Sequence, residues 1–428
     1  SLPRKLAMQT DIHIPRFRLG KKHVDIFPYW VGLLVLGILF GMYGAFVVLR
    51  DGLDVTGLTN KVPWGLWVVM DLASISLGGS AFVFGVIVYL MKLKRFETVA
   101  KLAVLLGFLG YTTAGMVIWF DLGQPFRFWH PMVFWQPHSL LWEITMCVIL
   151  YLGVLSAEML PVVVEHSFFY EHPLHKRFPI IKKLVELAKK VAHLLHKLVP
   201  VLAVIGLTLS LLHQASLGAY YSVLNGRGVW FNQSAPVQFV FSAMSGGIAF
   251  LFFTGVIMFR MMRPGLVKDE ILYDVARLSG GITLLLTYLR LWDWAVTYYY
   301  SFDVNITLQT EALNAVAPYS STFWIGQILL PIIAGAAMFS AKSIKNFRYL
   351  MVFSLFPMAA AVLTRWNYNF AGLIAMPTYD PYTPIIRISS YTPTWPEFAV
   401  ATLVVSYWLL AFSVAARYLP FKSPEATH

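Results

Sequence analysis

A histidine and a glutamine, His213 and Gln214, stand side by side within a long apolar run of the chain. The run extends from about residue 198 to residue 224, which is enough for a helix to cross the hydrocarbon core of a bilayer. Polar side chains at that depth are costly unless they face protein, water or a ligand. A neutral imidazole can donate a hydrogen bond and pass a proton, which makes His213 a candidate for proton-coupled chemistry. The alternative is that it joins two helices by a hydrogen bond.

Acidic residues occur in the neighbouring apolar runs, toward the same side of the expected membrane as His213. They are Asp71, Asp121 and Glu143, whereas Glu158 is the main acid of the opposite half. Carboxylates that are buried without a counter-charge exchange protons near neutral pH. An acidic group around a histidine is therefore typical of a proton-coupled site.

Later apolar runs carry charges of both signs, namely Arg290, Asp293, Arg365 and Glu397. Opposite charges inside a membrane can pair and hold helices together. A structural role and a functional role are therefore both open for this second group.

The composition is that of a helical membrane protein. Of the 428 residues, 58% are hydrophobic and only 13% are charged. The first 27 residues contain no apolar segment of the kind found in a signal peptide. A formal net charge of +12 would suggest a nucleic-acid partner for a soluble domain, but here we expect the basic residues to gather on one membrane face. No nucleic-acid partner is expected.

The single cysteine, Cys147, limits the cofactors that this chain can hold by itself. One thiol excludes a disulfide framework, a cysteine-rich zinc site and an iron–sulfur cluster bound by this chain alone. A haem held by two histidines within the bilayer would need a second deeply placed histidine, and His213 is the only one expected there. We therefore expect no haem, flavin, iron–sulfur cluster or metal site in this chain.

Ten apolar runs bounded by charged residues, proline and glycine predict ten membrane-spanning helices. Their approximate limits are 28–49, 64–91, 99–121, 139–164, 198–224, 236–262, 271–299, 318–341, 347–373 and 395–418. Lysine and arginine gather in the N-terminal segment, the even-numbered turns and the tail. The opposite loops hold only Arg50, Lys61, Arg127, Arg227 and Arg387. This asymmetry predicts that both termini are cytoplasmic, in agreement with an even number of spans.

We expect an all-α integral membrane protein in which two four-helix bundles are flanked by further helices. A cytoplasmic segment (1–27) precedes the first span and its outer loop (28–63). The first bundle, spans 2–5, covers 64–224, and the second, spans 6–9, covers 225–373; an outer loop, the tenth span and a cytoplasmic tail fill 374–428. The doublets Gly78-Gly79 and Gly246-Gly247, each followed by a similar apolar sequence, suggest that the two bundles are repeats.

Three connecting segments have distinctive compositions. Residues of about 180–197 place apolar side chains at helical spacing with lysines between them, which predicts an amphipathic helix on the inner leaflet. The outer stretches 122–138 and 375–394 are rich in aromatic residues and proline. That composition suits an interfacial aromatic belt and the docking of another subunit equally well.

Several of these motifs together carry a family resemblance. They are Pro63-Trp64-Gly65-Leu66-Trp67 before Asp71, Asp121-Leu122-Gly123, Trp142-Glu143, Glu158-Met159-Leu160-Pro161, His213-Gln214-Ala215-Ser216-Leu217-Gly218, Leu289-Arg290-Leu291, Arg365-Trp366 and Thr392-Pro393-Thr394-Trp395-Pro396-Glu397. In this order the chain resembles the polysulfide-reductase membrane-subunit (NrfD-like) family, over about residues 60 to 420. It is most similar to the branch that serves periplasmic hydrogenase and menaquinone reductase complexes.

The resemblance implies a cofactor-free subunit of a respiratory complex in a bacterial inner membrane. Such a subunit exchanges electrons between the menaquinone pool and a periplasmic ferredoxin-like iron–sulfur subunit, and we favour quinone reduction. Further periplasmic partners would be a multihaem cytochrome c, a molybdopterin-type subunit or a hydrogenase subunit. The acid in Leu291-Trp292-Asp293 and the long basic insertion at 165–197 depart from the hydrogenase-type pattern, which leaves the physiological partner open.

The resemblance also implies roles for individual residues. Catalysis would fall to His213, Asp121 and Glu143, and the quinone would bind near Trp64, Asp71, Asp121, His213 and Gln214. A proton path would use Glu143, Glu158, Arg290, Asp293, Arg365 and Glu397.

Two other classes of function are considered. A proton-coupled secondary transporter would also have ten spans, buried charges and a repeat, but its polar groups would be reached from both sides. A purely structural membrane anchor would need no acidic group beside a histidine. Quinone and an iron–sulfur partner that co-purify in mild detergent would separate these hypotheses.

Overall fold

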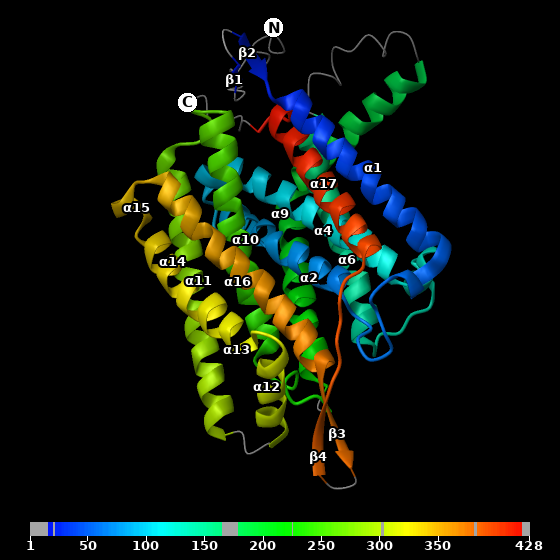
Figure 1. The fold of residues 1–428 in the computed structure, drawn as a ribbon. Helices are drawn as coiled ribbons and strands as arrows, with labels where there is room; N and C mark the ends of the chain where they lie inside the picture. Colours follow the sequence, from blue (N-terminus) through cyan, green and yellow to red (C-terminus); the bar gives the residue numbers. More distant parts are fainter. Residues whose placement is uncertain are drawn as a thin grey trace.

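The computed structural model describes residues 16–19, 22–164, 179–224, 226–300, 304–380 and 383–421, and nearly all of this part of the chain is helical. Long helices run side by side as one bundle, and the first long helix begins at the same end at which the last one finishes (Figure 1). Nine helices in the described ranges are long and apolar enough to cross a membrane. The predicted all-α integral membrane protein is confirmed.

The first half of the chain supplies one flanking helix, α1, and four packed spans, of which one is formed by α2 and α3 together. Their bounds are α1 (Phe27–Asp51), α2 (Leu66–Leu77), α3 (Ser80–Gly85), α4 (Glu97–Asp121), α6 (Leu140–Val164) and α9 (Pro179–Ser222). Helix α4 packs against α2, α3 and α6, and α9 packs against α6 and α3. These helices, without α1, are called the first group.

The second half repeats this arrangement. Its helices are α10 (Ala235–Val256), α11 (Asp269–Tyr300), α14 (Leu330–Phe339), α16 (Phe347–Ile374) and α17 (Trp395–Tyr418). Helices α10, α11, α14 and α16, the second group, pack in a ring, because each contacts the next and α16 returns to α10. Helix α17 lies outside both groups against α1 and α4.

The two groups meet where their glycine doublets cross. A Cβ added to Gly79 would lie 2.6 Å from the carbonyl oxygen of Ala243, and one added to Gly247 would lie 2.8 Å from the backbone nitrogen of Ser80. Only glycine allows backbones to approach this closely. The doublet of each group therefore packs against the other group, which explains why both sequences need it.

Short elements close the two ends of the bundle. The antiparallel hairpin β3 (Ala375–Asp380) and β4 (Thr383–Ile388) projects from one end, here called the hairpin end, together with α12 (Val304–Val316). The other end, at which α1 begins and α17 finishes, is called the terminal end, and the hairpin of β1 (Arg16–Leu19) and β2 (Lys22–Asp25) lies there (Figure 1). Neither hairpin was predicted from the sequence.

The remaining short elements are turns at the ends of the long helices. They are η1 (Gly52–Val55), η3 (Lys94–Phe96), η4 (Pro125–Arg127), α5 (His130–Val133), α13 (Tyr319–Ser321) and α15 (Ala341–Ile344). Three π-helical turns are η2 (Val86–Leu90), η5 (Ile257–Met262) and η6 (Thr322–Leu329). Two of them, η2 and η5, end the crossing helices α3 and α10 at corresponding places in the two groups.

Two expectations from the sequence need correction. The predicted span 271–299 corresponds to α11, which is long enough to cross a membrane but less apolar than the other nine helices because it carries Asp274, Arg277, Arg290 and Asp293. The amphipathic stretch of about 180–197 is not a separate helix: it is continuous with the following span in the 44-residue α9. No glycine interrupts α9 before Gly206, and Pro200 is accommodated within it. The histidines of the preceding basic connection, His172 and His175, lie outside the described residues.

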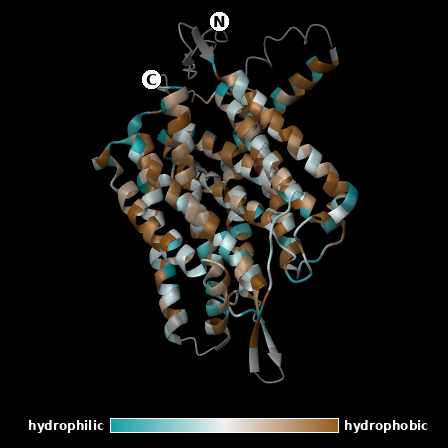
Figure 2. Cartoon of the chain, viewed as in Figure 1, coloured by the Kyte–Doolittle hydropathy of each residue, from teal (hydrophilic) through white to brown (hydrophobic). Residues whose placement is uncertain are grey.

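The outer surface of the bundle is apolar. Figure 2 shows hydrophobic residues along the lengths of the long helices and hydrophilic ones mainly toward their ends. On α1, Leu36 is 64% exposed and Phe40 is 49% exposed, although both lie in the middle of the helix. Such a surface is stable in contact with lipid chains, so the bundle is built to sit in a bilayer.

Candidate functional site

Four polar side chains lie at one depth in four different helices. His213 is nine residues before the end of α9, and Arg365 is nine before the end of α16, which places each about 14 Å from the hairpin end of its helix. Tyr111 and Arg290 are ten residues before the ends of α4 and α11, or about 15 Å. Together with Gln214 they form what is here called the mid-bundle layer, and every member is buried.

His213 is completely buried, and its ring nitrogens, Nδ1 and Nε2, have no hydrogen-bond partner among the described residues. Its ring lies 5.7 Å from that of Tyr111, which in turn meets Tyr151 at 4.7 Å. The hydroxyl groups of Tyr111 and Ser210 are also buried, and they lie close to each other without a hydrogen bond of standard geometry in the described protein. Buried polar groups normally have partners, so the surroundings of His213 are the candidate site.

Two acidic residues of the first group, Asp71 and Asp121, lie between this layer and the hairpin end. Asp71 is 8% exposed on α2, close enough to Asp121 and to Tyr111 for their charges to interact. Asp121 is the last residue of α4 and lies near Glu397, and its Oδ1 is buried without a partner among the described residues. Asp121, Asp71, Tyr111 and His213 thus follow one another inward.

The charged side chain that acts most on His213 is an arginine rather than a carboxylate. Arg365 is fully buried and near His213. Its Nη2 donates to Oε1 of Gln214 at 3.3 Å and to the carbonyl of Phe239 at 3.1 Å, and its guanidinium lies 3.7 Å from the ring centroid of Phe239. Gln214 also donates to the carbonyl of Ile75 at 3.4 Å. The pair Gln214–Arg365 therefore joins the two groups within the mid-bundle layer.

Within the described part of the chain, Arg290 and Asp293 form no ion pair with each other, although pairing of these opposite charges was one possibility. Arg290 donates to the carbonyl of Gln327 at 3.2 Å and to the hydroxyl of Thr364 instead of to an acid. The carbonyl acceptor belongs to the π-helical turn η6, a type of turn that is frequent at functional sites.

Asp293 is held by neutral groups. Its carboxylate accepts hydrogen bonds from Asn232 at 2.9 Å, Ser234 at 2.6 Å and Gln238 at 3.0 Å. Asp293 lies nearly a turn closer to the hairpin end than Arg290, beside the start of α10, and so meets the polar side chains of that segment rather than Arg290.

Glu397 holds several elements together at the hairpin end. It is 1% exposed, and its Oε2 accepts from the backbone nitrogens of Gly57 at 2.7 Å and Thr394 at 2.9 Å. Its Oε1 accepts from the hydroxyl of Tyr391, which accepts from the backbone nitrogen of Leu66 at 2.7 Å. Burial and then the bond to Glu397 raise the pKa of Tyr391, so its hydroxyl remains a donor. Through these bonds Glu397 acts as a structural clamp, which means here that it holds the segment before α2 against the segment before α17.

The other predicted site residues lie outside the mid-bundle layer. Glu143 is half-buried and accepts a hydrogen bond from the Cys147 thiol at 3.4 Å, one turn along α6. Glu158 lies farther along α6, toward the terminal end, and is also half-buried. Trp64 stacks on Trp230 with ring centroids 6.0 Å apart, and its carbonyl accepts from Asn369 at 3.1 Å. Trp64 thus belongs to an aromatic cluster between the two groups.

Sequence reasoning missed Tyr111, Tyr151, Ser210 and Trp230. Tyr111 and Tyr151 look like ordinary aromatic residues of apolar runs, and only the packing of α4, α6 and α9 brings Tyr111 to His213 and both hydroxyls close to Ser210. One signal was present, because Ser210 and His213 are three residues apart and therefore share a face of a helix. No group of three or more histidine, cysteine, aspartate or glutamate side chains within the described ranges could hold a metal ion.

The sequence profile of the polysulphide reductase NrfD family matches residues 54–377. A similar protein is the menaquinone reductase integral membrane subunit of Nitratidesulfovibrio vulgaris, which is 29% identical over 413 residues, covering 94% of this chain and 93% of the relative. A selenate reductase subunit of Mesobacillus selenatarsenatis is 25% identical, with 94% and 96% covered. The membrane subunit of a putative dimethyl sulfoxide reductase of Halobacterium salinarum is also 25% identical, with 93% of each chain covered. These relatives match along nearly their whole lengths.

Proposed function

The chain belongs to the NrfD family of membrane subunits, and on this premise we propose that it binds a membrane quinone of the menaquinone class. It would do so as a subunit of a respiratory oxidoreductase complex. The integral membrane subunit of a menaquinone reductase is among its relatives, and other relatives are subunits of reductases with different names. A common role for such subunits is electron exchange between the membrane and partner proteins, and the same role is proposed for this chain.

The observation that carries the proposal is the surroundings of His213. Reduction of a quinone adds two electrons and two protons, and each carbonyl oxygen becomes a hydroxyl. A site for this reaction needs hydrogen-bond donors that can pass protons, in a place from which bulk water is excluded. His213 offers an imidazole without a partner among the described residues, and the hydroxyl of Tyr111, with only Ser210 close to it, lies in the same buried mid-bundle layer.

The acids toward the hairpin end provide a proton route in this proposal. Protons would pass from Asp121 to Asp71 and then by way of Tyr111 to His213, in the order in which these groups lie. Arg365 would stabilise negative charge that develops beside His213, because a buried cation acts strongly in a low dielectric.

Electrons would come from a partner. We assign electron supply to a periplasmic iron–sulfur subunit, since relatives of this chain are named as subunits of reductases. That subunit would dock at the hairpin end, where β3, β4, α12 and the aromatic segment around α5 are gathered. The basic residues of the terminal end support our proposal that both termini are cytoplasmic.

The test compares Asp121→Asn with Asp54→Asn in the complex purified in mild detergent. Asp54 is an exposed carboxylate at the same end of the bundle, so its replacement is a matched control. We expect quinone in the purified complex, and a fall of about 10²-fold in quinone turnover for Asp121→Asn alone, as for a lost proton carrier. Reduction of the partner by its own donor should be unchanged. Equal turnover in both variants, or a complex without quinone, would contradict the proposal.

A further inference from the structure

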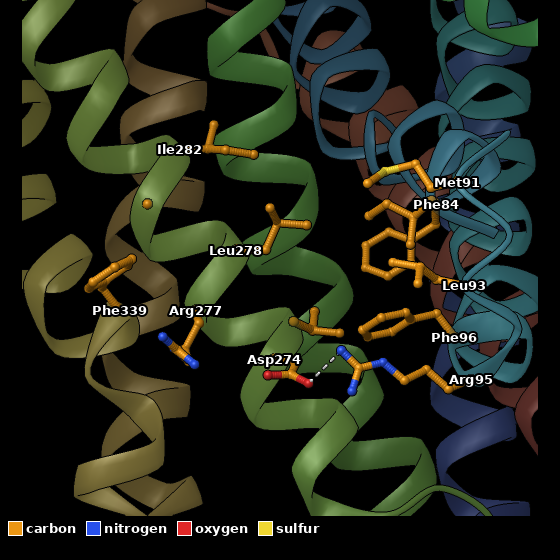
Figure 3. A pocket seen from close by; sticks show the side chains of 13 residues that line it. Phe84, Met91, Leu93, Arg95, Phe96, Asp274, Arg277, Leu278, Ile282 and Phe339 are labelled. Carbon is orange, nitrogen blue, oxygen red and sulfur yellow. Dashed lines mark ion pairs between the residues drawn. The ribbon is translucent and has the colours of Figure 1, made fainter.

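A groove of about 490 Å³ opens between the two groups near the terminal end, far from the mid-bundle layer. One wall comes from α3, η2 and the following turn, with Phe84, Met91 and Phe96. The opposite wall comes from α11 and from Phe339 at the end of α14 (Figure 3). The volume is in the range of about 300–1,000 Å³ that is typical of sites for small molecules.

The groove is polar at one end and apolar along its length. Asp274, Leu278 and Ile282 lie one above the other on α11, so the apolar part extends about 12 Å from the carboxylate (Figure 3). Met91 is 60% exposed and Phe339 is 50% exposed at its margins. An occupant therefore needs a hydrocarbon part that is covered by these side chains.

Cationic groups predominate at the polar end. Asp274 is shared between Arg95, at 3.2 Å from Nη2, and Lys342, at 2.7 Å from Nζ. Arg277, less than one turn further along α11, packs 5.6 Å from the ring centroid of Phe339 and pairs with no carboxylate among the described residues. The charged residues that line the groove, Arg95, Arg277 and Asp274, leave one excess positive charge, and Lys342, bound to Asp274, adds another beside it.

We propose that this groove binds one anionic phospholipid of the leaflet at the terminal end. The phosphate would lie at Arg277 and Arg95, and an acyl chain would follow Leu278, Gly281 and Ile282. Guanidinium groups bind phosphate oxygens through charge-assisted hydrogen bonds, and basic sites between membrane helices suit anionic headgroups. A neutral quinone headgroup would gain nothing from the excess positive charge. The bound lipid would fill the space between the two groups at the end opposite to their proposed chemistry.

The test uses native mass spectrometry of the full chain with added phosphatidylglycerol or phosphatidylcholine bearing the same acyl chains. Arg277→Gln removes the unpaired cation, and Arg348→Gln is the matched control because Arg348 is an exposed arginine of the same end that does not line the groove. Gly281→Val narrows the apolar part without changing charge. A Cβ at this position would meet only the ring of Phe339, at 3.6 Å, so the helix is expected to keep its shape.

We expect one phosphatidylglycerol to bind saturably to the unmodified chain and to Arg348→Gln. Affinity should fall roughly 10-fold or more in Arg277→Gln, as for the loss of a bond to a charged group, and also in Gly281→Val. Millimolar inorganic phosphate should not displace the lipid.

Four results would overturn the proposal. Equal effects of Arg277→Gln and Arg348→Gln would mean general attraction of anions, and displacement by phosphate would mean a free-anion site. If phosphatidylcholine bound as tightly as phosphatidylglycerol, the headgroup charge would not determine the affinity. Loss of binding in Gly281→Val alone would indicate a neutral occupant such as quinone.

Discussion

Tyr391 joins the beginning of α2 to the beginning of α17 through one hydroxyl group, so Tyr391→Phe is expected to loosen the hairpin end of the bundle. The hydroxyl accepts a hydrogen bond from the backbone nitrogen of Leu66 at 2.7 Å and donates to Glu397. The tyrosine ring can approach so closely because Gly65 has no side chain, and a Cβ there would collide with it. Phenylalanine keeps the ring and removes both bonds.

The size of the effect follows from the two bonds. An unsatisfied buried N–H costs about 1–3 kcal/mol, and a lost hydrogen bond to a charged group costs about 1.5–3 kcal/mol. Partial exposure of this region to water reduces both terms, so we expect a loss of about 2–5 kcal/mol in the free energy of unfolding. Glu397→Gln should cost less, because the amide oxygen can still accept from Gly57 and Thr394.

The assay is reversible unfolding of the purified chain in mixed detergent micelles. The matched control is Tyr349→Phe, which makes the same chemical change at a side chain that is 63% exposed at the other end of the bundle. In a double-mutant cycle, Tyr391→Phe and Glu397→Gln should show a coupling energy above about 0.5 kcal/mol, as expected for residues in contact.

A Tyr391→Phe variant as stable as Tyr349→Phe would refute this reasoning. The same experiment separates the two roles considered for Glu397. If Glu397 is a structural residue, Glu397→Gln should lower stability, and the complexes that do assemble should turn over quinone normally. If assembled and stable Glu397→Gln complexes lost turnover, Glu397 would be a proton carrier after all.

Three further predictions address topology, the buried arginines and helix packing. The topology is tested in a chain in which Cys147 is replaced by alanine. A cysteine introduced at the exposed Gln233 should react with an impermeant thiol reagent in whole cells, and one at the exposed Ser343 should not. The reverse pattern would place the hairpin end in the cytoplasm. Arg365→Met should leave the midpoint of thermal unfolding unchanged or raise it, because it removes a buried cation that has no ion pair among the described residues. Quinone turnover should fall at least about 10-fold. A large loss of stability with normal turnover would mean that Arg365 has a structural role. Gly372→Ala should lower the free energy of unfolding by about 1–3 kcal/mol, because the new Cβ would collide with the indole of Trp230. Gly115→Ala, where a Cβ has nothing within 4 Å, should be neutral or stabilising by up to about 1 kcal/mol. Equal stabilities of the two variants would contradict the packing at Trp230.

The helices were predictable because a bilayer imposes length and hydropathy on each span. The same physics explains the exception at α11, since a helix that packs on one side against α10 and α14 can turn Arg290 and Asp293 toward polar groups of neighbouring elements. The family resemblance, carried by motifs spread along the chain, is confirmed by the NrfD match over residues 54–377.

The partners of the polar residues were less predictable, because they depend on how each helix is rotated about its axis. The positions of His213 and Arg365 along their spans predicted how deep each lies in the membrane, but not that the two side chains are close to each other. They are close because α9 and α16 both pack on α10. Arg290 and Asp293 are close in sequence but bond to different neighbours, because three residues along a helix separate them by about 4.5 Å along its axis. Tyr111 could not be distinguished from other buried aromatic residues until its neighbours were known.

The most direct test of the account is the rate of quinone reduction by an assembled complex that carries His213→Gln. Glutamine can hydrogen-bond between helices but cannot pass a proton as imidazole does, and His196→Gln, at an exposed position in the first half of α9 and away from the hairpin end, is the matched control. We expect normal assembly and normal reduction of the partner subunit for both variants, with quinone turnover lowered roughly 10²–10⁴-fold only for His213→Gln. Normal quinone turnover in an assembled His213→Gln complex would contradict the assignment of the site to the mid-bundle layer.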